Sequence, residues 1–288
     1  MTVEPASAIA PRPLLAAWTL CERELVRFFR QRQRVFGAIA QPVIFWVLFG
    51  AGLGGTFRLG ATGATGAGGE VSAAAGPSFR EYFFPGTLAL ILLFTAIFAT
   101  ISIIEDRREG FLQSVLVAPL PRWAMVFGKV LGGTLIALVQ GLLFLALALA
   151  FQIQLTIPAV AAAVGVMFLV AWGLTSLGFV LAWRLDSTQG FHAVMSVLLM
   201  PMWLLSGAFF PQPQGEGLVE RGVALLMAIN PMTYGVAALR RVLVADPAAL
   251  PSDLPSLGVS LAATAAFAAA TFALACRVSG RHTTGDYL

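Results

Sequence analysis

The densest charge in this sequence is a run of five consecutive side chains of both signs. They are Glu105, Asp106, Arg107, Arg108 and Glu109. An apolar face follows at helical spacing, made of Phe111, Leu112, Val115 and Leu116. A proline pair, Pro119 and Pro121, then ends any helix. Mixed charge beside an apolar face suits a short interfacial helix that offers polar groups to a soluble partner; a solvated turn that only holds topology is the alternative.

Other reactive residue types are too sparse to build a catalytic or metal site. A phosphate-binding P-loop needs Gly, four residues, then Gly-Lys-Ser/Thr, but the only Gly-Lys pair precedes Val130 and has Trp123 at the upstream glycine position. Each histidine and cysteine stands alone: His192, His282, Cys21 and Cys276. Serine-histidine pairs or carboxylate clusters for hydrolysis cannot be assembled. We therefore expect a chain that is not an enzyme, with reduced thiols and no cofactor or metal of its own.

The composition is that of a membrane protein. Hydrophobic residues make up 58% of the 288 and charged residues 11%, with a mean hydropathy of +0.85. Soluble domains carry roughly 25% charged residues, so a surface this poor in charge requires lipid as its solvent. The net charge of +4 fits basic cytoplasmic loops and does not indicate nucleic-acid binding.

Six apolar segments are long enough to span a bilayer, which takes about 20 residues. They are residues 35–54, 85–104, 125–151, 158–183, 191–210 and 257–276. Placing both termini in the cytoplasm puts 13 Lys and Arg inside and 5 outside, as the positive-inside rule favours. Arginines interrupt the stretch before Val35, so no cleavable signal is evident and the first span would direct insertion. The expected fold is an all-α polytopic protein of the cell (inner or plasma) membrane, with six transmembrane helices and N-in/C-in topology.

The segments outside the spans complete the expected organisation. Residues 1–34 form a cytoplasmic tail that contains an interfacial amphipathic helix, Leu14–Arg34; an ordinary basic tail is the alternative. The apolar face of this helix comprises Leu14, Trp18, Cys21, Leu25 and Phe28. Residues 35–276 form the six-span domain, with a Gly-rich flexible linker at 60–77, and residues 277–288 form a second cytoplasmic tail.

A re-entrant helical hairpin is expected on the outer side between the fifth and sixth spans. One helix covers about Leu218–Ile229, and a second begins at Asn230-Pro231, a capping residue followed by proline. Arg240 and Arg241 make the second helix too polar to span at modest cost. A seventh span is the alternative, and it would change the side on which the C-terminus lies.

The spans themselves carry almost no ionisable groups. Lys129 is the exception, and its position near the cytoplasmic end of the third span allows its ammonium to reach the interface. Ion-coupled carriers usually hold their ion with buried Asp, Glu or His. Uphill transport by this chain would therefore draw its energy from a partner, and a buried acidic or histidine ion site would contradict this interpretation.

Four motifs in the correct order resemble those of the permeases of type-2 ATP-binding-cassette (ABC) exporters. The charged run precedes Ser114–Pro119, which is similar to the leucine-valine-alanine-proline signature of that family. Phe84–Gly86 opens the second span, Leu205–Pro211 closes the fifth, and Asn230–Tyr234, with Leu239-Arg240 behind it, begins the hairpin. Each motif is weak alone, but together they cover the chain from about Phe84 to Arg240.

The resemblance implies a dimer, a second copy of the chain being the expected partner, in which each protomer docks on a separate cytoplasmic ATPase that binds MgATP. The docking and coupling residues it implies are Glu105, Asp106, Arg107, Arg108, Glu109, Phe111, Leu112 and Leu116. The substrate path between the protomers would be lined by Gln41, Phe45, Phe49, Phe94, Phe98, Gln140, Thr175, Ser176 and Ser196. Small-residue pairs such as Gly128 and Gly132 fit close helix packing.

The function expected from residues and resemblance together is that of an ABC exporter permease for a hydrophobic or amphipathic substrate: a drug-like compound, a lipid or a lipid-linked glycan. A stand-alone channel or carrier is disfavoured by the spans without ionisable groups. A membrane scaffold that tethers other proteins through the charged run remains an alternative. ATP-dependent movement of substrate distinguishes the transporter from the scaffold.

Overall fold

The structure, a computed structural model, describes residues 12–32, 35–37, 40, 43–44, 46–48, 79–150, 155–209, 213, 215, 217–244, 250–251 and 253–280. All regular secondary structure within these ranges is helical. The helices are α1 (Pro13–Arg30), α3 (Phe79–Ala99), α4 (Ile101–Arg108), α5 (Phe111–Val117), α6 (Arg122–Ala150), α7 (Ile157–Arg184), α8 (Thr188–Leu204), α9 (Leu218–Ile229), α10 (Pro231–Leu243) and α11 (Leu257–Gly280).

Several described helices are long and apolar enough to cross a bilayer, so this is a multi-pass membrane protein. Four single segments qualify, namely Phe83–Arg108, Arg122–Ala148, Ile157–Arg184 and Leu257–Gly280. They confirm helices at the second, third, fourth and sixth predicted spans. Most of the predicted first span lies outside the described residues, as does the linker at 60–77. The predicted fifth span, 191–210, is the 17-residue helix α8, shorter than expected at its C-terminal side.

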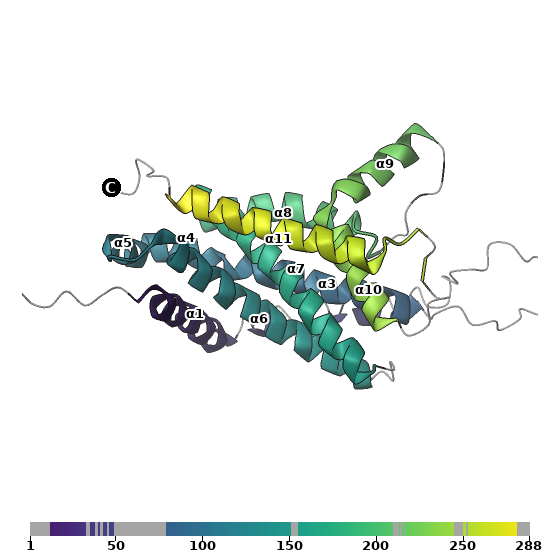
Figure 1. The fold of residues 1–288 in the computed structure, drawn as a ribbon, viewed down its shortest axis with the longest axis horizontal. Helices are drawn as coiled ribbons and strands as arrows, with labels where there is room; N and C mark the ends of the chain where they lie inside the picture. The colour runs from purple at the N-terminus through teal and green to yellow at the C-terminus, as the bar shows by residue number, and fades with distance from the viewer. Residues whose placement is uncertain are drawn as a thin grey trace, which may run out of the picture.

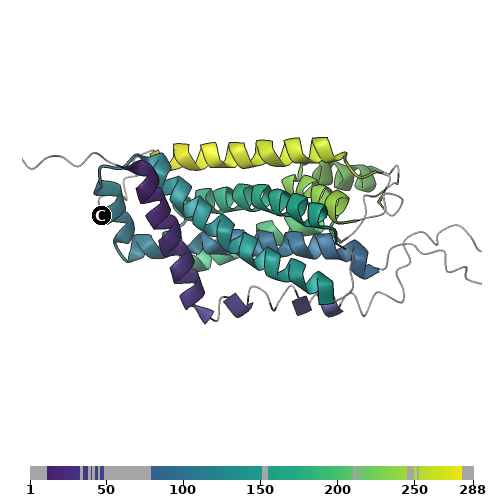
Figure 2. The same ribbon diagram turned by 60° about the horizontal axis from the view of Figure 1, so that its bottom comes forward.

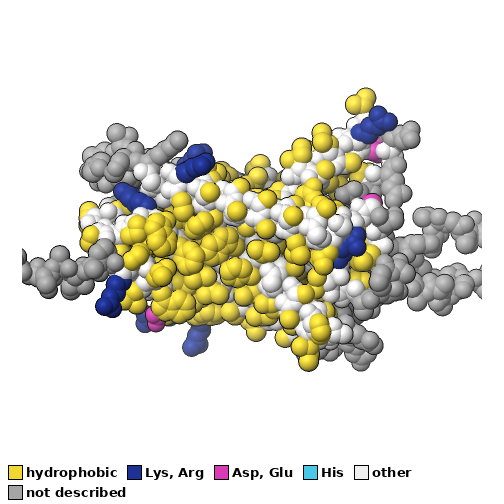
Figure 3. All heavy atoms as spheres, viewed as in Figure 1, with side chains coloured by type: hydrophobic (Ala, Val, Ile, Leu, Met, Phe, Trp, Pro, Cys, Tyr) yellow, Lys and Arg dark blue, Asp and Glu magenta, His cyan; other side chains and the backbone are white. Residues whose placement is uncertain are grey.

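The long helices lie side by side, with α3, α6 and α7 at the centre of the bundle (Figure 1). One end of the bundle carries α1, α4, α5 and the end of α11, and the opposite end carries α9 and α10 (Figures 1 and 2). Hydrophobic side chains cover the middle of the visible face, while Lys and Arg lie towards its two ends (Figure 3). This distribution is the one expected of a protein whose middle lies in lipid.

The helix α1 crosses α6 obliquely instead of lying apart from the bundle (Figure 2). The face in contact comprises Ala17, Leu20, Cys21, Glu24 and Phe28. Of the predicted apolar face, Cys21 and Phe28 are therefore buried in the chain, whereas Leu14 and Trp18 are 68% and 55% exposed. The helix thus has two apolar sides, one against α6 and one that is exposed.

The predicted charged loop is helical for most of its charged length. A break at Thr100, whose hydroxyl donates to the Ile97 carbonyl at 2.6 Å, separates α3 from α4. The helix α4 then continues through Arg108, so the charged run is mainly the last turn of a spanning segment. Gly110 has a φ of 79°, in the left-handed region that favours glycine, and it turns the chain into α5.

The hairpin helices lie where the sequence predicts them, as α9 and α10. Asn230 caps α10 by accepting a hydrogen bond from the Met232 amide at 3.0 Å, and Pro231 occupies the first helical position. The two helices are bent by 77° from one another, so they do not form a straight seventh span. Pro201 lies inside α8, three residues before its end.

Candidate functional site

A seam of small residues brings α1 against the start of α6. The side-chain position of Gly128 faces the Ala17 carbonyl so closely that any larger residue would collide with it. A Cβ on Gly132 would lie 2.8 Å from the Cβ of Glu24 and 3.3 Å from the Cys21 carbonyl. The predicted close-packing role of this glycine pair is therefore confirmed, and its partner is α1. This contact places the charged side chains of α1 beside those of α4 and α6.

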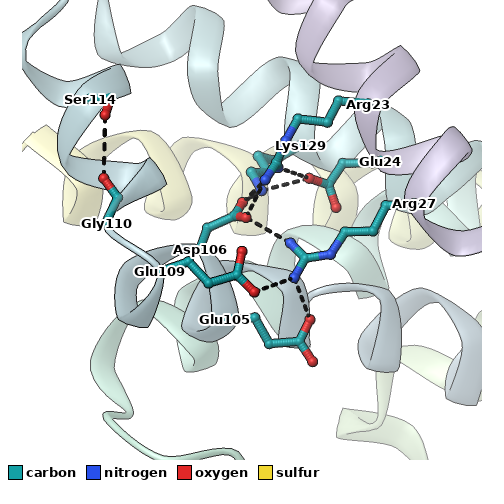
Figure 4. A network of polar contacts seen from close by, with 9 residues as sticks. All are labelled: Arg23, Glu24, Arg27, Glu105, Asp106, Glu109, Gly110, Ser114 and Lys129. Carbon is teal, nitrogen blue, oxygen red and sulfur yellow. Dashed lines mark hydrogen bonds and ion pairs between the residues drawn. The ribbon is translucent and has the colours of Figure 1, made fainter.

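The Asp106 carboxylate is the centre of the resulting ion-pair cluster, which we define as Arg23, Glu24, Arg27, Glu105, Asp106, Glu109 and Lys129 (Figure 4). Arg23 donates to both carboxylate oxygens of Asp106, at 2.7 and 3.1 Å. Arg27 donates to Oδ1 at 2.7 Å, and the Lys129 ammonium donates to Oδ2. The Asp106 side chain is fully buried, so the carboxylate connects three helices from inside the protein.

Lys129 is buried and paired, which corrects the expectation that it extends alone to the interface. Its side chain is 4% exposed, and its ammonium donates to Glu24 at 2.6 Å as well as to Asp106. A buried charge that loses its partner is costly, whereas a fully hydrogen-bonded pair is tolerated. Both carboxylate oxygens of Asp106 already accept bonds from cationic side chains, so this buried acid does not have the open oxygens of an ion-coupling site.

The edge of the cluster is more open to solvent than its centre. The Arg27 guanidinium also contacts the carboxylates of Glu105 and Glu109, at 3.0 and 3.2 Å. The Arg23 guanidinium stacks over the Phe111 ring of α5, with its carbon 3.6 Å from the ring centroid. Burial lowers the pKa of Arg23, but the hydrogen bond and charge of Asp106 more than offset this and raise its pKa above the ordinary value. Arg23 therefore stays charged at any working pH.

The other two arginines of the charged run hold the end of α7. Arg107 donates to the carbonyls of Trp183 at 2.7 Å and Leu185 at 3.3 Å. Arg108 donates to the Asp186 carbonyl at 3.2 Å. The last carbonyls of a helix lack partners within it and carry partial negative charge, so cations are favourable there. These two side chains fix the connection between α7 and α8 to α4.

The predicted docking residues thus divide by exposure. Asp106 and Leu112 are buried, and Glu105, Arg107, Phe111 and Leu116 are partly exposed. Arg108 and Glu109 are exposed, as are Gln113, Ser114 and Val117 of α5. These exposed residues therefore lie at the end of α4, in the turn before α5 and on α5 itself. Docking at these residues stays a prediction.

The six predicted substrate-path residues that the structure describes do not form one surface. Gln41, Phe45 and Phe49 lie outside the described residues. Three others are in the core of the bundle: Gln140, whose Oε1 accepts a 2.6 Å hydrogen bond from Thr95, and the neighbouring pair Thr175 and Ser176. Phe94 and Phe98 are partly exposed on α3, where Phe98 contacts His192 of α8 at a ring distance of 5.4 Å, and Ser196 is exposed on α8.

Three members of the ion-pair cluster on α1, and the pairing of Lys129, were not identified from the sequence. Glu24 gives the clearest signal, because it falls at helical spacing between Cys21 and Phe28 on an otherwise apolar face. An acidic residue in such a position indicates a buried cation nearby. The sequence does not indicate which cation this is, because Lys129 lies 105 residues further along the chain.

Comparisons with known proteins agree with this architecture. A family model described as ABC-2 type transporter matches residues 16–244, a range that includes most of α1, the ion-pair cluster and the hairpin. The chain is 24% identical over 226 residues to the putative transport permease ycf38 of Cyanophora paradoxa, covering 77% of this chain and 72% of that protein. It is 29% identical over 201 residues to the probable multidrug ABC transporter permease YbhR of Escherichia coli K12, covering 68% of this chain and 52% of the relative. Because the family model covers well over half of the sequence, the chain belongs to the ABC-2 type transporter family.

Proposed function

We propose that this chain is the permease subunit of an ABC exporter, working as a dimer with a separate cytoplasmic ATPase that binds and hydrolyses MgATP. In this proposal the chain crosses the cell membrane six times, with both termini in the cytoplasm and the hairpin α9–α10 in the outer leaflet. The substrate is a hydrophobic or amphipathic molecule. Family membership supports the transporter class, and the name of the E. coli relative is in line with a drug-like substrate.

The observation that carries the proposal is the ion-pair cluster. It joins the interfacial helix α1 to the inner ends of two candidate spans, through Asp106 of α4 and Lys129 of α6. A displacement of any one of these helices would leave a charge unpaired in a buried site, which is costly. The three helices are therefore expected to move together, as a coupling element between an ATPase and the bundle requires.

Docking and coupling are separate roles in this arrangement. The exposed side chains of Arg108, Glu109 and α5 are available for contact with the ATPase. Asp106 transmits the movement from inside, because its carboxylate is inaccessible to a partner. Surface ion pairs contribute only about 0–1 kcal/mol each, so the apolar residues of α5, with Val117 84% exposed, would supply much of the affinity.

The substrate path is proposed along the exposed side of α8. The buried residues of this helix form a stripe at four-residue spacing: Phe191, Met195, Leu199 and Trp203. Much of its remaining surface, including Ser196, is exposed in the single chain, and the exposed His192 contacts Phe98 of α3. A second copy facing this side would enclose an apolar path with a few polar groups, a lining that suits amphipathic molecules.

The direct test is reconstitution of the chain in vesicles with and without a cognate nucleotide-binding subunit. We expect no ATP hydrolysis by the chain alone, and hydrolysis by the complex together with ATP-dependent movement of ethidium or a fluorescent phospholipid. A P-loop lysine variant of the ATPase is the control for hydrolysis. The proposal is wrong if the nucleotide-binding subunit fails to associate, or if the chain drives uphill transport without it.

A matched pair of variants tests whether the ATPase docks at the end of the bundle that carries α5. Arg108 and Arg221 are both exposed arginines, at opposite ends of the bundle. Arg108→Glu should weaken binding of the ATPase by roughly two- to fivefold, the effect of one surface ion pair and a new repulsion. Arg221→Glu should leave binding unchanged. Equal affinity of both variants for the ATPase, measured by co-purification and titration, would place the docking surface elsewhere.

A further inference from the structure

Three motifs that are far apart in the sequence meet at the end of the bundle opposite the ion-pair cluster (Figure 1). The helix α8 ends there at Leu204, which leaves its last carbonyls without partners inside the helix. Side chains of α10 and of its cap donate to one carbonyl of this last turn and to one in the turn that follows it. Asn230 donates to Met202 at 2.6 Å, and Arg240 donates to the carbonyl of Gly207 at 3.1 Å.

A third helix, α3, is joined at the same place. The Trp203 indole of α8 donates to the Gly86 carbonyl of α3 at 2.9 Å. A Cβ on Gly86 would lie 2.7 Å from the Ala208 carbonyl, so only glycine allows the two backbones to approach this closely. Gly207 has a φ of 74°, which again favours glycine. We call the set Gly86, Trp203, Gly207, Asn230, Thr233 and Arg240 the motif junction.

The motif junction is almost fully buried, with Arg240 3% and Asn230 7% exposed. Thr233 adds hydrogen bonds to the carbonyls of Leu205, at 3.3 Å, and Met227, at 2.6 Å. Carbonyls buried inside a bundle cannot exchange these donors for water without cost. The arginine also places positive charge beside the negative end of α8. The helix α10 and its cap are therefore bonded at several points to the end of α8 and to the turn that follows it.

We infer that the motif junction is a second coupling point, which makes the hairpin α9–α10 move with α8 and α3, and that Arg240 and Trp203 are positioning residues for transport. This rests on the proposed function. The segment Phe83–Arg108 carries the ion-pair cluster at one end, through Asp106, and the motif junction at the other, through Gly86. A shift of α4 by the ATPase is transmitted along this segment to the hairpin, which opens or closes the far end of the path.

Hydrogen exchange in the complete complex in nanodiscs tests this inference without knowledge of the substrate. Exchange is measured without nucleotide and after trapping the ATPase with ADP and vanadate. In the wild type we expect trapping to change exchange both in α1 and α4 and in the hairpin, residues 218–243. In Arg240→Gln and in Trp203→Phe, the effect of trapping on hydrogen exchange in the hairpin should be at least about threefold smaller than in the wild type. Its effect on exchange in α1 and α4 should persist.

Matched variants separate coupling from mere structural damage. Arg240→Lys keeps a buried donor and should restore part of the hairpin response, which a general loss of packing would not predict. Arg221→Gln and Trp172→Phe alter the same residue types outside the motif junction and should behave as wild type. Trp172 packs against Phe168 and Phe272, and no hydrogen bond from its indole is found among the described residues.

The outcomes distinguish this inference from the function it rests on. A wild-type hairpin that does not respond while α1 and α4 do respond would overturn the coupling role, as would an undiminished hairpin response in both Arg240→Gln and Trp203→Phe. Absence of any response in α1 and α4 of the wild type would instead contradict the proposed function. If Arg240→Gln fails to fold, Trp203→Phe decides alone, because it removes a single donor and keeps most of the ring.

Discussion

Asp106 holds cationic side chains from two other helices at a single carboxylate, and this arrangement explains why a charged residue is tolerated at the end of a spanning segment. Arg23 and Arg27 come from α1 and Lys129 from α6. An acid without such partners would be neutralised or expelled towards water. The same carboxylate is thereby unavailable for a transported ion, so its burial is compatible with transport driven by a partner.

Removal of this negative charge should be the most damaging conservative change on the charged run. Asp106→Asn keeps the size of the side chain but leaves the buried ammonium of Lys129 with only Glu24. Breaking a buried ion pair costs about 3–5 kcal/mol. We therefore expect the free energy of unfolding of the purified protein to fall by this amount. Asp186→Asn is the control, since the Asp186 side chain is 96% exposed and its change should cost less than about 1 kcal/mol. Similar losses for both would disprove the central role of Asp106.

The reactivity of the Cys21 thiol shows whether α1 remains packed against α6. Burial, followed by the charges of Glu24 and Glu22, raises the pKa of this thiol from 9.0 to about 11. A raised pKa leaves less reactive thiolate at every pH below it, and a shift of two units corresponds to roughly 100-fold less. At pH 7 we expect Cys21 to react with a maleimide at least about 100-fold more slowly than a cysteine placed at the exposed Thr19 in a Cys21→Ala background. Rapid labelling of Cys21 would show that α1 leaves the bundle.

At the scale of the elements, hydrophobic periodicity predicts the helices well and their contacts poorly. The expected hairpin helix Leu218–Ile229 has the observed bounds, because glycine and asparagine mark both of its ends. The interfacial helix was also predicted, but its packing face was not, since that face is selected by two glycines on α6 about 110 residues away. Likewise, Glu24 and Lys129 are paired by the fold, and nothing local in either segment identifies the other.

The glycine seam between α1 and α6 should be intolerant of even one methyl group. Gly128→Ala forces the new methyl against the Ala17 carbonyl, and overpacking of this kind costs about 1–3 kcal/mol. We expect a lower unfolding temperature and faster maleimide labelling of Cys21, because the displaced contact is the one that buries this thiol. Gly165→Ala in α7 is the control, since a methyl there meets nothing within 4 Å and improves helix propensity. An unchanged rate of Cys21 labelling in Gly128→Ala would contradict close packing of α1 against α6 at this glycine.

For the whole molecule, the sequence correctly indicated a helical membrane protein of the ABC-2 type, because composition and motif order do not depend on tertiary detail. The candidate docking and path residues were less predictable. The last turn of a spanning helix and a solvated loop can have the same charged composition. The sequence therefore did not indicate that the Asp106 side chain points into the protein. In the same way, the hydrogen bond of Gln140 to Thr95 inside the core was not evident from its polarity, and its place on a substrate path stays a prediction.

The proposed topology makes a distinct prediction about access from the two sides of the membrane. The described ends of the chain, near α1 and the end of α11, lie at the same end of the bundle, and α9 lies at the other (Figure 2). Single cysteines at Arg12 and Arg277 should react with a membrane-impermeant maleimide only from the cytoplasmic side. A cysteine at Val219, which is 75% exposed on α9, should react only from outside. Labelling of all three from one side would require a different number of crossings.

The pairing of Asp106 with Lys129 also bears on biosynthesis. The two charges are 23 residues apart, in segments that leave the ribosome one after the other. On insertion scales a lone Asp or Lys at the centre of a helix costs roughly 2.5–3.5 kcal/mol, and less towards its ends. Arg23 and Arg27 of α1 have left the ribosome before Asp106, and Lys129 completes the buried cluster with Asp106 and Glu24. The insertion channel is therefore expected to retain the earlier segments until α6 supplies this last cation. Nascent chains truncated before Lys129 should stay cross-linked to the channel longer than chains that extend through α6.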